Sequence, residues 1–64
     1  MENNIRKLRK EKGMRQEDLA RSLGVSRQPI NAIENNKYNP TLELAMRLAR
    51  FLNTTVEELF ILED

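Results

Sequence analysis

The side chains between Gln16 and Asn35 are the ones in this chain best suited to do chemistry, because they combine guanidinium and amide groups at helical spacing. Arg27 carries five N–H donors in a fixed fork, and the amides of Gln28 and Asn31 can each donate and accept. In the major groove of duplex DNA, Arg matches the acceptors of guanine, and Gln or Asn matches the donor and acceptor of adenine. These residue types predict contacts with the edges of bases.

Catalysis has little to build on in this sequence. Histidine and cysteine are absent, and the sequence contains neither a glycine-rich phosphate loop nor a metal-ligand motif. Glu57 and Glu58 are neighbours on an expected helix, so they point in different directions and cannot act as a paired acid and base. We therefore expect a non-enzymatic protein with no catalytic residues, metal, cofactor or small-molecule ligand.

The elements that must position these side chains are helices. Turn residues divide the chain into five short segments with helical periodicity, which predicts an all-α fold. The expected helices cover residues 4–12, 16–23, 27–35, 42–52 and 56–60. Their apolar stripes predict a core that contains Ile5, Leu8, Leu19, Leu23, Val25, Ile30, Ile33, Leu44, Ala45, Leu48, Ala49 and Leu52.

Turn and cap residues mark where these helices begin and end. Gly24 can adopt the positive φ that a tight turn between the second and third helices requires. Ser26 and Thr41 have the short oxygen-bearing side chains of N-caps. Thr55 and Glu58 have the spacing of a capping box, in which hydroxyl and carboxylate each accept from the other residue's backbone N–H. The last residues, FILED, are either a frayed helix end or a short pairing strand.

Size and charge narrow the class of protein. A chain of 64 residues forms a single domain and has no apolar run long enough to span a membrane. The sequence shows no secretory signal and no cysteines for disulfides, so we expect a cytoplasmic protein. Residues 1–37 carry nine Lys or Arg against five Asp or Glu, whereas residues 38–64 carry two against five. The basic part can face a polyanion.

The sequence resembles the Cro/C1-type helix-turn-helix family of phage and prokaryotic regulators, also called the xenobiotic-response-element (XRE) family. The resemblance rests on the segments QEDLA, LGVSRQ, INAIENNKYNP and LELAMRLARFLNTTVEELF, which occur in the family's order and spacing. It covers about residues 4–60 and implies a five-helix, lambda-repressor-like domain over residues 5–60, with the helix-turn-helix motif at residues 16–35.

The resemblance also implies roles for individual residues. It implies that the third helix lies in the major groove of DNA and that the second crosses the phosphate backbone. The residues expected to contact bases are Ser26, Arg27, Gln28 and Asn31, and those expected to contact phosphate are Arg15, Gln16, Asn35, Lys37 and Tyr38. A buried Arg9–Glu34 ion pair is implied between the first and third helices, with an exposed placement of both side chains as the alternative.

Three positions depart from the family pattern. Arg15 stands where a Ser, Thr or Asn cap is usual, so the second helix is expected to be poorly capped. Pro29 replaces a Thr or Ser and removes a backbone donor that Ser26 could cap. Asn36 replaces a common Gly at a helix end, a mild change because Asn tolerates the left-handed conformation.

The function expected from these features is that of a transcriptional regulator, more specifically a repressor, which binds a palindromic operator as a homodimer. Two reading heads double the number of bases read. The apolar residues available for the dimer interface are Phe51, Phe60, Ile61 and Leu62. An antitoxin-like module that binds a partner protein and its own promoter is the alternative, disfavoured because the domain fills nearly the whole sequence.

Overall fold

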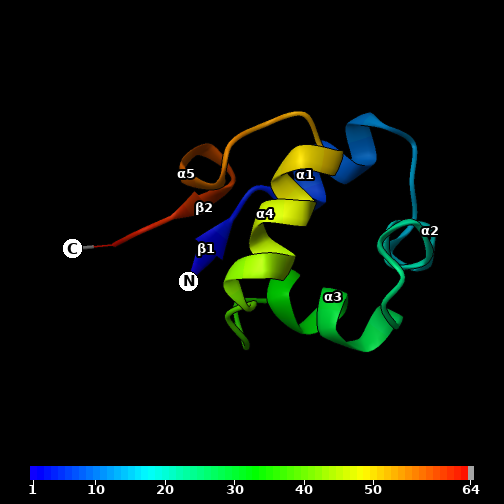
Figure 1. The fold of residues 1–64 in the computed structure, drawn as a ribbon, viewed down its shortest axis with the longest axis horizontal. Helices are drawn as coiled ribbons and strands as arrows, with labels where there is room; N and C mark the ends of the chain where they lie inside the picture. Colours follow the sequence, from blue (N-terminus) through cyan, green and yellow to red (C-terminus); the bar gives the residue numbers. More distant parts are fainter. Residues whose placement is uncertain (64) are drawn as a thin grey trace.

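Helix α4 (Leu42–Phe51) lies in the middle of the structure, and the other elements surround it (Figure 1). The computed structural model describes residues 1–63. The further elements are β1 (Glu2–Asn3), α1 (Ile5–Glu11), α2 (Gln16–Leu23), α3 (Arg27–Glu34), α5 (Val56–Leu59) and β2 (Phe60–Ile61). The five expected helices are therefore confirmed, and the fold is mostly helical with one small sheet.

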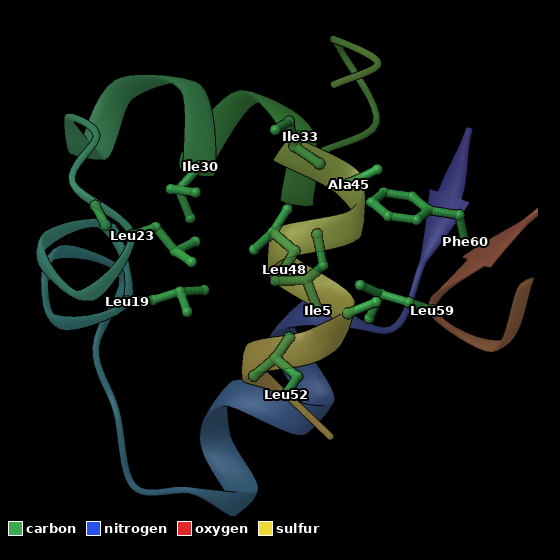
Figure 2. Packing of buried hydrophobic residues seen from close by; sticks show 12 residues of the cluster. Ile5, Leu19, Leu23, Ile30, Ile33, Ala45, Leu48, Leu52, Leu59 and Phe60 are labelled. Atoms are coloured by element: carbon green, nitrogen blue, oxygen red, sulfur yellow. The ribbon is translucent and has the colours of Figure 1, made fainter. Parts of the chain in front are cut away.

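The core is built from side chains of all five helices. The fully buried residues are Ile5, Leu19, Ile30, Ile33, Leu48 and Leu59. Figure 2 shows Leu48 of α4 surrounded by side chains of the other helices. The predicted core is confirmed, although Leu8, Val25 and Leu44 are only partly buried at its margin.

Among residues 1–63, four take the left-handed conformation, and they end or separate the helices. Gly24 has a φ of 71° and forms the turn between α2 and α3, and Gly13 has a φ of 68° after α1. Asn36 and Asn53 have φ values of 61° and 59°, which confirms the left-handed conformation expected for Asn36. Local chemistry thus sets these helix boundaries as the sequence predicts.

The N-cap residues of α3 and α4 are the two that the sequence predicts. Thr41 accepts a hydrogen bond from the Leu44 backbone N–H at 3.2 Å, as predicted. Ser26 occupies the N-cap position of α3, but its side chain forms no cap hydrogen bond. The predicted N-cap position is therefore confirmed, and the missing hydrogen bond has the predicted cause, because Pro29, the third residue of α3, lacks the N–H that would be donated.

The capping box at α5 is present only in part. The Thr55 hydroxyl accepts from the Glu58 backbone N–H at 3.2 Å. The Glu58 carboxylate accepts from the Thr55 hydroxyl at 3.1 Å, and not from the Thr55 backbone as predicted. The hydroxyl can serve both groups because it has a donor as well as acceptor lone pairs.

The start of α2 is better capped than its sequence suggests. The Asp18 carboxylate accepts from the Arg15 backbone N–H at 2.9 Å, which supplies the returning half of a capping box. This hydrogen bond is the main reason that the pKa of Asp18 lies below its ordinary value. Helix α2 therefore begins with half of a capping box, although Arg15 is not one of the usual N-cap residues.

The two ends of the chain pair with each other. Strands β1 and β2 are antiparallel, with Glu2 opposite Ile61 and Asn3 opposite Phe60, and they lie side by side at one side of the molecule (Figure 1). The strand interpretation of the tail is thus confirmed for Phe60–Ile61, and Phe60 belongs to this strand and not to the fifth helix as predicted. The expectation for Asp64 lies outside the described residues.

The amide of Asn3 fastens this sheet to α3. Its Nδ2 donates to the Ile33 carbonyl at 2.8 Å, and its Oδ1 accepts from the Ile5 backbone N–H at 3.1 Å. The N-terminal strand, which the sequence did not predict, thereby connects the end of the recognition motif to the C-terminal strand.

Within residues 1–63, no helix has the length and apolar character needed to cross a bilayer.

Replacing Leu48 by alanine should destabilise the protein strongly. Leu48 is 0% exposed at the centre of the core, and Leu→Ala at such sites costs about 2–5 kcal/mol. Urea denaturation followed by circular dichroism measures the change. Lys7→Ala is the control, since Lys7 is exposed on α1 and should change the free energy of unfolding by less than about 0.5 kcal/mol. Equal losses in the two variants would contradict the described core.

Candidate nucleic-acid interface

Helices α2 and α3 form one rigid unit across the turn at Gly24. The Val25 backbone N–H donates to the Ala20 carbonyl at 3.0 Å, which closes the turn. From α4, the Arg47 guanidinium donates to the Leu23 carbonyl at the end of α2. This hydrogen bond satisfies a carbonyl that has no partner within the helix and fixes the turn to the central helix.

One face of α3 is buried and the other is polar and exposed. Ile30 and Ile33 point into the core (Figure 2). Arg27, Gln28 and Asn31 are exposed, as is Ser26 just before the helix. The structure therefore brings all the predicted base-contacting residues to the outer side of the third helix.

A buried ion pair joins α1 to α3. Arg9 Nε lies 2.8 Å from Glu34 Oε2, and Arg9 Nη2 lies 3.1 Å from Glu34 Oε1. Arg9 is 7% and Glu34 8% exposed, so the buried placement is confirmed over the exposed one. The remaining Arg9 Nη1 donates to the Met14 carbonyl at 2.8 Å. The pair is thus bidentate, and it also holds the loop before α2.

Charge and hydrogen bonding keep Glu34 ionised inside the protein. Burial raises the pKa of this carboxyl, but hydrogen bonds from Arg9 and Gln16 and the positive charge of Arg9 outweigh burial and hold the pKa below its ordinary value of 4.5. Glu34 is therefore a fixed negative charge around which donors from other helices assemble.

Gln16, predicted to contact phosphate, connects this carboxylate to the exposed face of α3. Its Nε2 donates to Glu34 Oε1 and to Asn31 Oδ1, each at 3.1 Å. Its Oε1 accepts from Arg27 Nε at 3.4 Å. One amide at the start of α2 thus sets the positions of two predicted base-contacting side chains.

Arg6 belongs to the same assembly and was not among the residues singled out from the sequence. Arg6 Nη2 donates to Asn35 Oδ1 at 2.9 Å, and Arg6 Nε lies 3.4 Å from Glu34 Oε1. Its position three residues before Arg9, on the same side of α1, was the available indication. The connected side chains, here called the polar network, are Arg6, Arg9, Gln16, Arg27, Asn31, Glu34 and Asn35.

A polar hollow lies at the start of α2. It is lined by Arg9, Arg15, Gln16, Glu17 and Arg27. The Arg15 side chain is 78% exposed and forms ion pairs of 3.5 Å with Glu17 and with Asp18. Guanidinium groups beside the N-terminus of a helix suit a phosphate. Lys37 and Tyr38 lie apart from this hollow, exposed after α3.

The predicted dimer residues do not form one surface. Phe60 is 8% exposed and belongs to the core, because pairing of β2 with β1 turns its side chain inward. Phe51 is half-buried beneath Lys12, whose Nζ lies 5.7 Å from the ring centroid. It also lies at the opposite end of α4 from Leu42, about 14 Å along the helix axis. Phe60 therefore offers little surface to a partner, the assignment of Phe51 stays a prediction, and Ile61 and Leu62 are exposed.

An apolar surface does exist, and most of it was not predicted. Leu42 is 72% and Met46 51% exposed on α4. Three neighbouring hollows connect these residues to the sheet. The first and the middle hollow share Leu42, and the middle and the last share Met1 and Val56. The members of this apolar surface are Met1, Leu42, Met46, Val56, Ile61 and Leu62. The positions of Leu42 and Met46 outside the core stripe of α4 were the signal in the sequence.

Among residues 1–63, no three His, Cys, Asp or Glu side chains are grouped so that they could hold a metal ion.

Two helices packed across a glycine turn, with polar side chains on the outside of the second, define a helix-turn-helix DNA-binding domain. A family model described as helix-turn-helix matches residues 5–59. The chain belongs to the Cro/C1-type helix-turn-helix (XRE) family and is a transcriptional regulator that acts by binding DNA and not by catalysis.

Relatives from archaea and bacteria agree with this placement. The chain is 48% identical to an uncharacterized HTH-type transcriptional regulator of Methanocaldococcus jannaschii, over 100% of this chain and 97% of that protein. It is 47% identical to another from Archaeoglobus fulgidus, over 100% and 91% of the two chains. One from Bacillus subtilis is 38% identical, over 100% and 97%.

Glu34→Gln should destabilise the protein in a pH-dependent way. Near neutral pH, a buried Arg9 without its counter-charge should cost about 3 kcal/mol. Because the pKa of Glu34 is lowered by folding, its contribution is complete above the ordinary value of 4.5 and is lost as the pH falls through the folded-state pKa.

The free energy of unfolding, measured in urea from neutral to acidic pH, should therefore converge for the wild type and Glu34→Gln at low pH. Glu57→Gln, at an exposed site, is the control and should follow the wild type throughout. A difference between wild type and Glu34→Gln that stays constant with pH would exclude this ion pair as its source.

Proposed function

We propose that the protein is a repressor that binds a palindromic operator in duplex DNA as a homodimer, with α3 in the major groove and α2 across the backbone. The observation that carries this proposal is the exposed row of Arg27, Gln28 and Asn31 on α3 beside the polar hollow at the start of α2. Base-edge readers lie next to a phosphate site, which is the arrangement that sequence-specific binding requires.

The proposed base-contacting side chains differ in how many of their donors and acceptors are already hydrogen-bonded within the protein. Gln28 is exposed and lies outside the polar network, so both ends of its amide can face a base edge. Arg27 shares only its Nε with Gln16, which leaves the other guanidinium donors for guanine. Ser26 precedes them, and its hydroxyl is not used as a helix cap. Arg27 and Gln28 are accordingly the main readers in this proposal.

Phosphate contacts fix the register of the domain on DNA. Arg15 and the backbone N–H groups at Gln16 suit one phosphate in the polar hollow. Lys37 and Tyr38, which are exposed after α3, suit a second phosphate, whereas Asn35 Nδ2 already donates to the carbonyl and to Oδ1 of Asn31. Such contacts add affinity for every sequence and weaken as salt rises.

The homodimer is supported by the apolar surface. Leu42 and Met46 expose large apolar side chains, and contiguous apolar patches on small soluble proteins mark interaction sites. Glu43 and Arg50 line the hollow beside these two residues. In a two-fold contact each residue of one copy can face a different residue of the other, so charges of both signs allow the surface to bind a second copy of itself.

Repression follows from occupancy. A dimer on its operator blocks access of other proteins to the same DNA, and the two reading heads, spaced roughly 34 Å apart, would contact successive major grooves on one side of the duplex. In a prokaryotic cell this function places the protein in the cytoplasm with the chromosome.

Gln28→Ala should lower the preference for the operator, identified by selection of bound duplexes from a random pool, over random DNA by about 1–3 kcal/mol. The reason is that a base-edge contact is lost. Lys37→Ala is the comparison variant, an exposed residue assigned to phosphate, and should weaken binding to both duplexes by similar factors. Fluorescence-anisotropy titrations of both variants on both duplexes measure the two ratios. Reversed behaviour of the two variants would exclude the assigned roles.

Leu42→Glu should convert a dimer into a monomer, because two carboxylates would be buried in the apolar surface of a two-fold contact. Sedimentation equilibrium at micromolar concentration measures the mass. Arg21→Glu introduces the same group at an exposed site on α2 outside that surface and should leave the dimer intact. A wild type that stays monomeric with and without DNA, or a Leu42→Glu variant that stays dimeric, would contradict the proposed interface.

A further inference from the structure

The side-chain amide of Asn31 lies where three helices exchange hydrogen bonds. Its Oδ1 accepts from Gln16 Nε2 of α2 and from Asn35 Nδ2 after α3, each at 3.1 Å. Beyond these two amides the polar network ends in charged groups. Gln16 Nε2 also donates to Glu34 Oε1 at 3.1 Å, and Asn35 Oδ1 accepts from Arg6 Nη2 at 2.9 Å.

These charged ends fix the direction of every hydrogen bond between them. A guanidinium can only donate, so Asn35 must present its oxygen to Arg6 and its nitrogen to Asn31. An ionised carboxylate can only accept, so Gln16 must present its nitrogen to Glu34, and the same nitrogen reaches Asn31. Donors thus arrive at Asn31 from both sides, and Asn31 must meet them with its oxygen.

The consequence concerns what Asn31 can offer to DNA. A carbonyl oxygen has two lone pairs, and here two N–H groups occupy them. The part of the exposed amide that remains for a base is Nδ2, which donates. Pairing of Asn with adenine needs the oxygen to accept from adenine N6 while the nitrogen donates to N7. The polar network removes the first half of that pattern.

We propose that Asn31 acts in the major groove as a donor only and therefore selects guanine, whose edge presents the acceptors N7 and O6, and not adenine. The inference rests on the DNA-binding mode proposed above and replaces the adenine preference that the residue type alone suggests. Guanine offers two neighbouring acceptors to the two N–H groups of Nδ2, whereas adenine offers only N7 beside its N6 donor and thymine offers only O4. Arg6 and Asn35 are positioning residues for this contact.

Selection of bound duplexes from a random pool, carried out with wild type, Asn31→Ala and Asn31→Asp, tests the proposal. The wild-type site should contain a G·C pair whose preference Asn31→Ala relaxes by about tenfold while the other positions keep theirs. Asn31→Asp presents an acceptor in place of the donor, so enrichment at that pair should move to a base with an exocyclic amine, cytosine or adenine.

DNA that lacks the N7 acceptor of guanine tests whether Asn31 contacts that atom. With 7-deazaguanine at that position, wild type should bind about tenfold more weakly and Asn31→Ala should be unaffected. Circular dichroism of each variant confirms that it is folded.

The failures of the two proposals can be told apart. A wild-type pool without any enriched sequence would overturn the proposed function and this inference with it. An enriched site in which Asn31→Ala relaxes an A·T pair, or no pair at all, would overturn this inference and leave sequence-specific binding intact.

Discussion

The arrangement of the helix-turn-helix motif depends on the buried carboxylate of Glu34. A charge removed from water must be paired and hydrogen-bonded, or it destabilises the fold by several kcal/mol. The donors that meet this requirement come from Arg9 and Arg6 on α1 and from Gln16 on α2. Because these donors come from two other helices, the carboxylate on α3 holds α1 and α2 in place against it.

The same assembly runs from the interior to the surface that faces DNA in the proposed binding mode. From Glu34 it passes through Gln16 to Arg27 and Asn31, two of the exposed side chains of α3. Side chains held by such bonds lose less freedom when they bind a partner, which favours affinity and narrows the set of accepted bases. The polar network that stabilises the packing of α1, α2 and α3 therefore also orients the groups that would contact the bases.

The apolar core determines which apolar side chains remain on the surface, where they can bind a partner. With 64 residues, the chain has room for one core, and Leu48 at its centre meets side chains from all sides (Figure 2). Pairing of the two chain ends draws Phe60 into this core, while Leu42 and Met46 stay outside on the far side of α4. A small domain thus separates into a polar face on α3 and an apolar face on α4 and the sheet.

The sequence by itself determined the five helices, the glycine turn and the polar face of α3, because hydrophobic periodicity and the φ preferences of Gly24 and Asn36 act within a few residues. It also identified the Arg9–Glu34 pair, though only through family resemblance. What only the tertiary structure decided are relationships between distant residues: the burial of Phe60 by a strand from the other end of the chain, and the part played by Arg6. The orientation of the Asn31 amide belongs with these. It depends on Arg6 and Glu34, two groups 28 residues apart, and no local pattern encodes which lone pairs such contacts occupy.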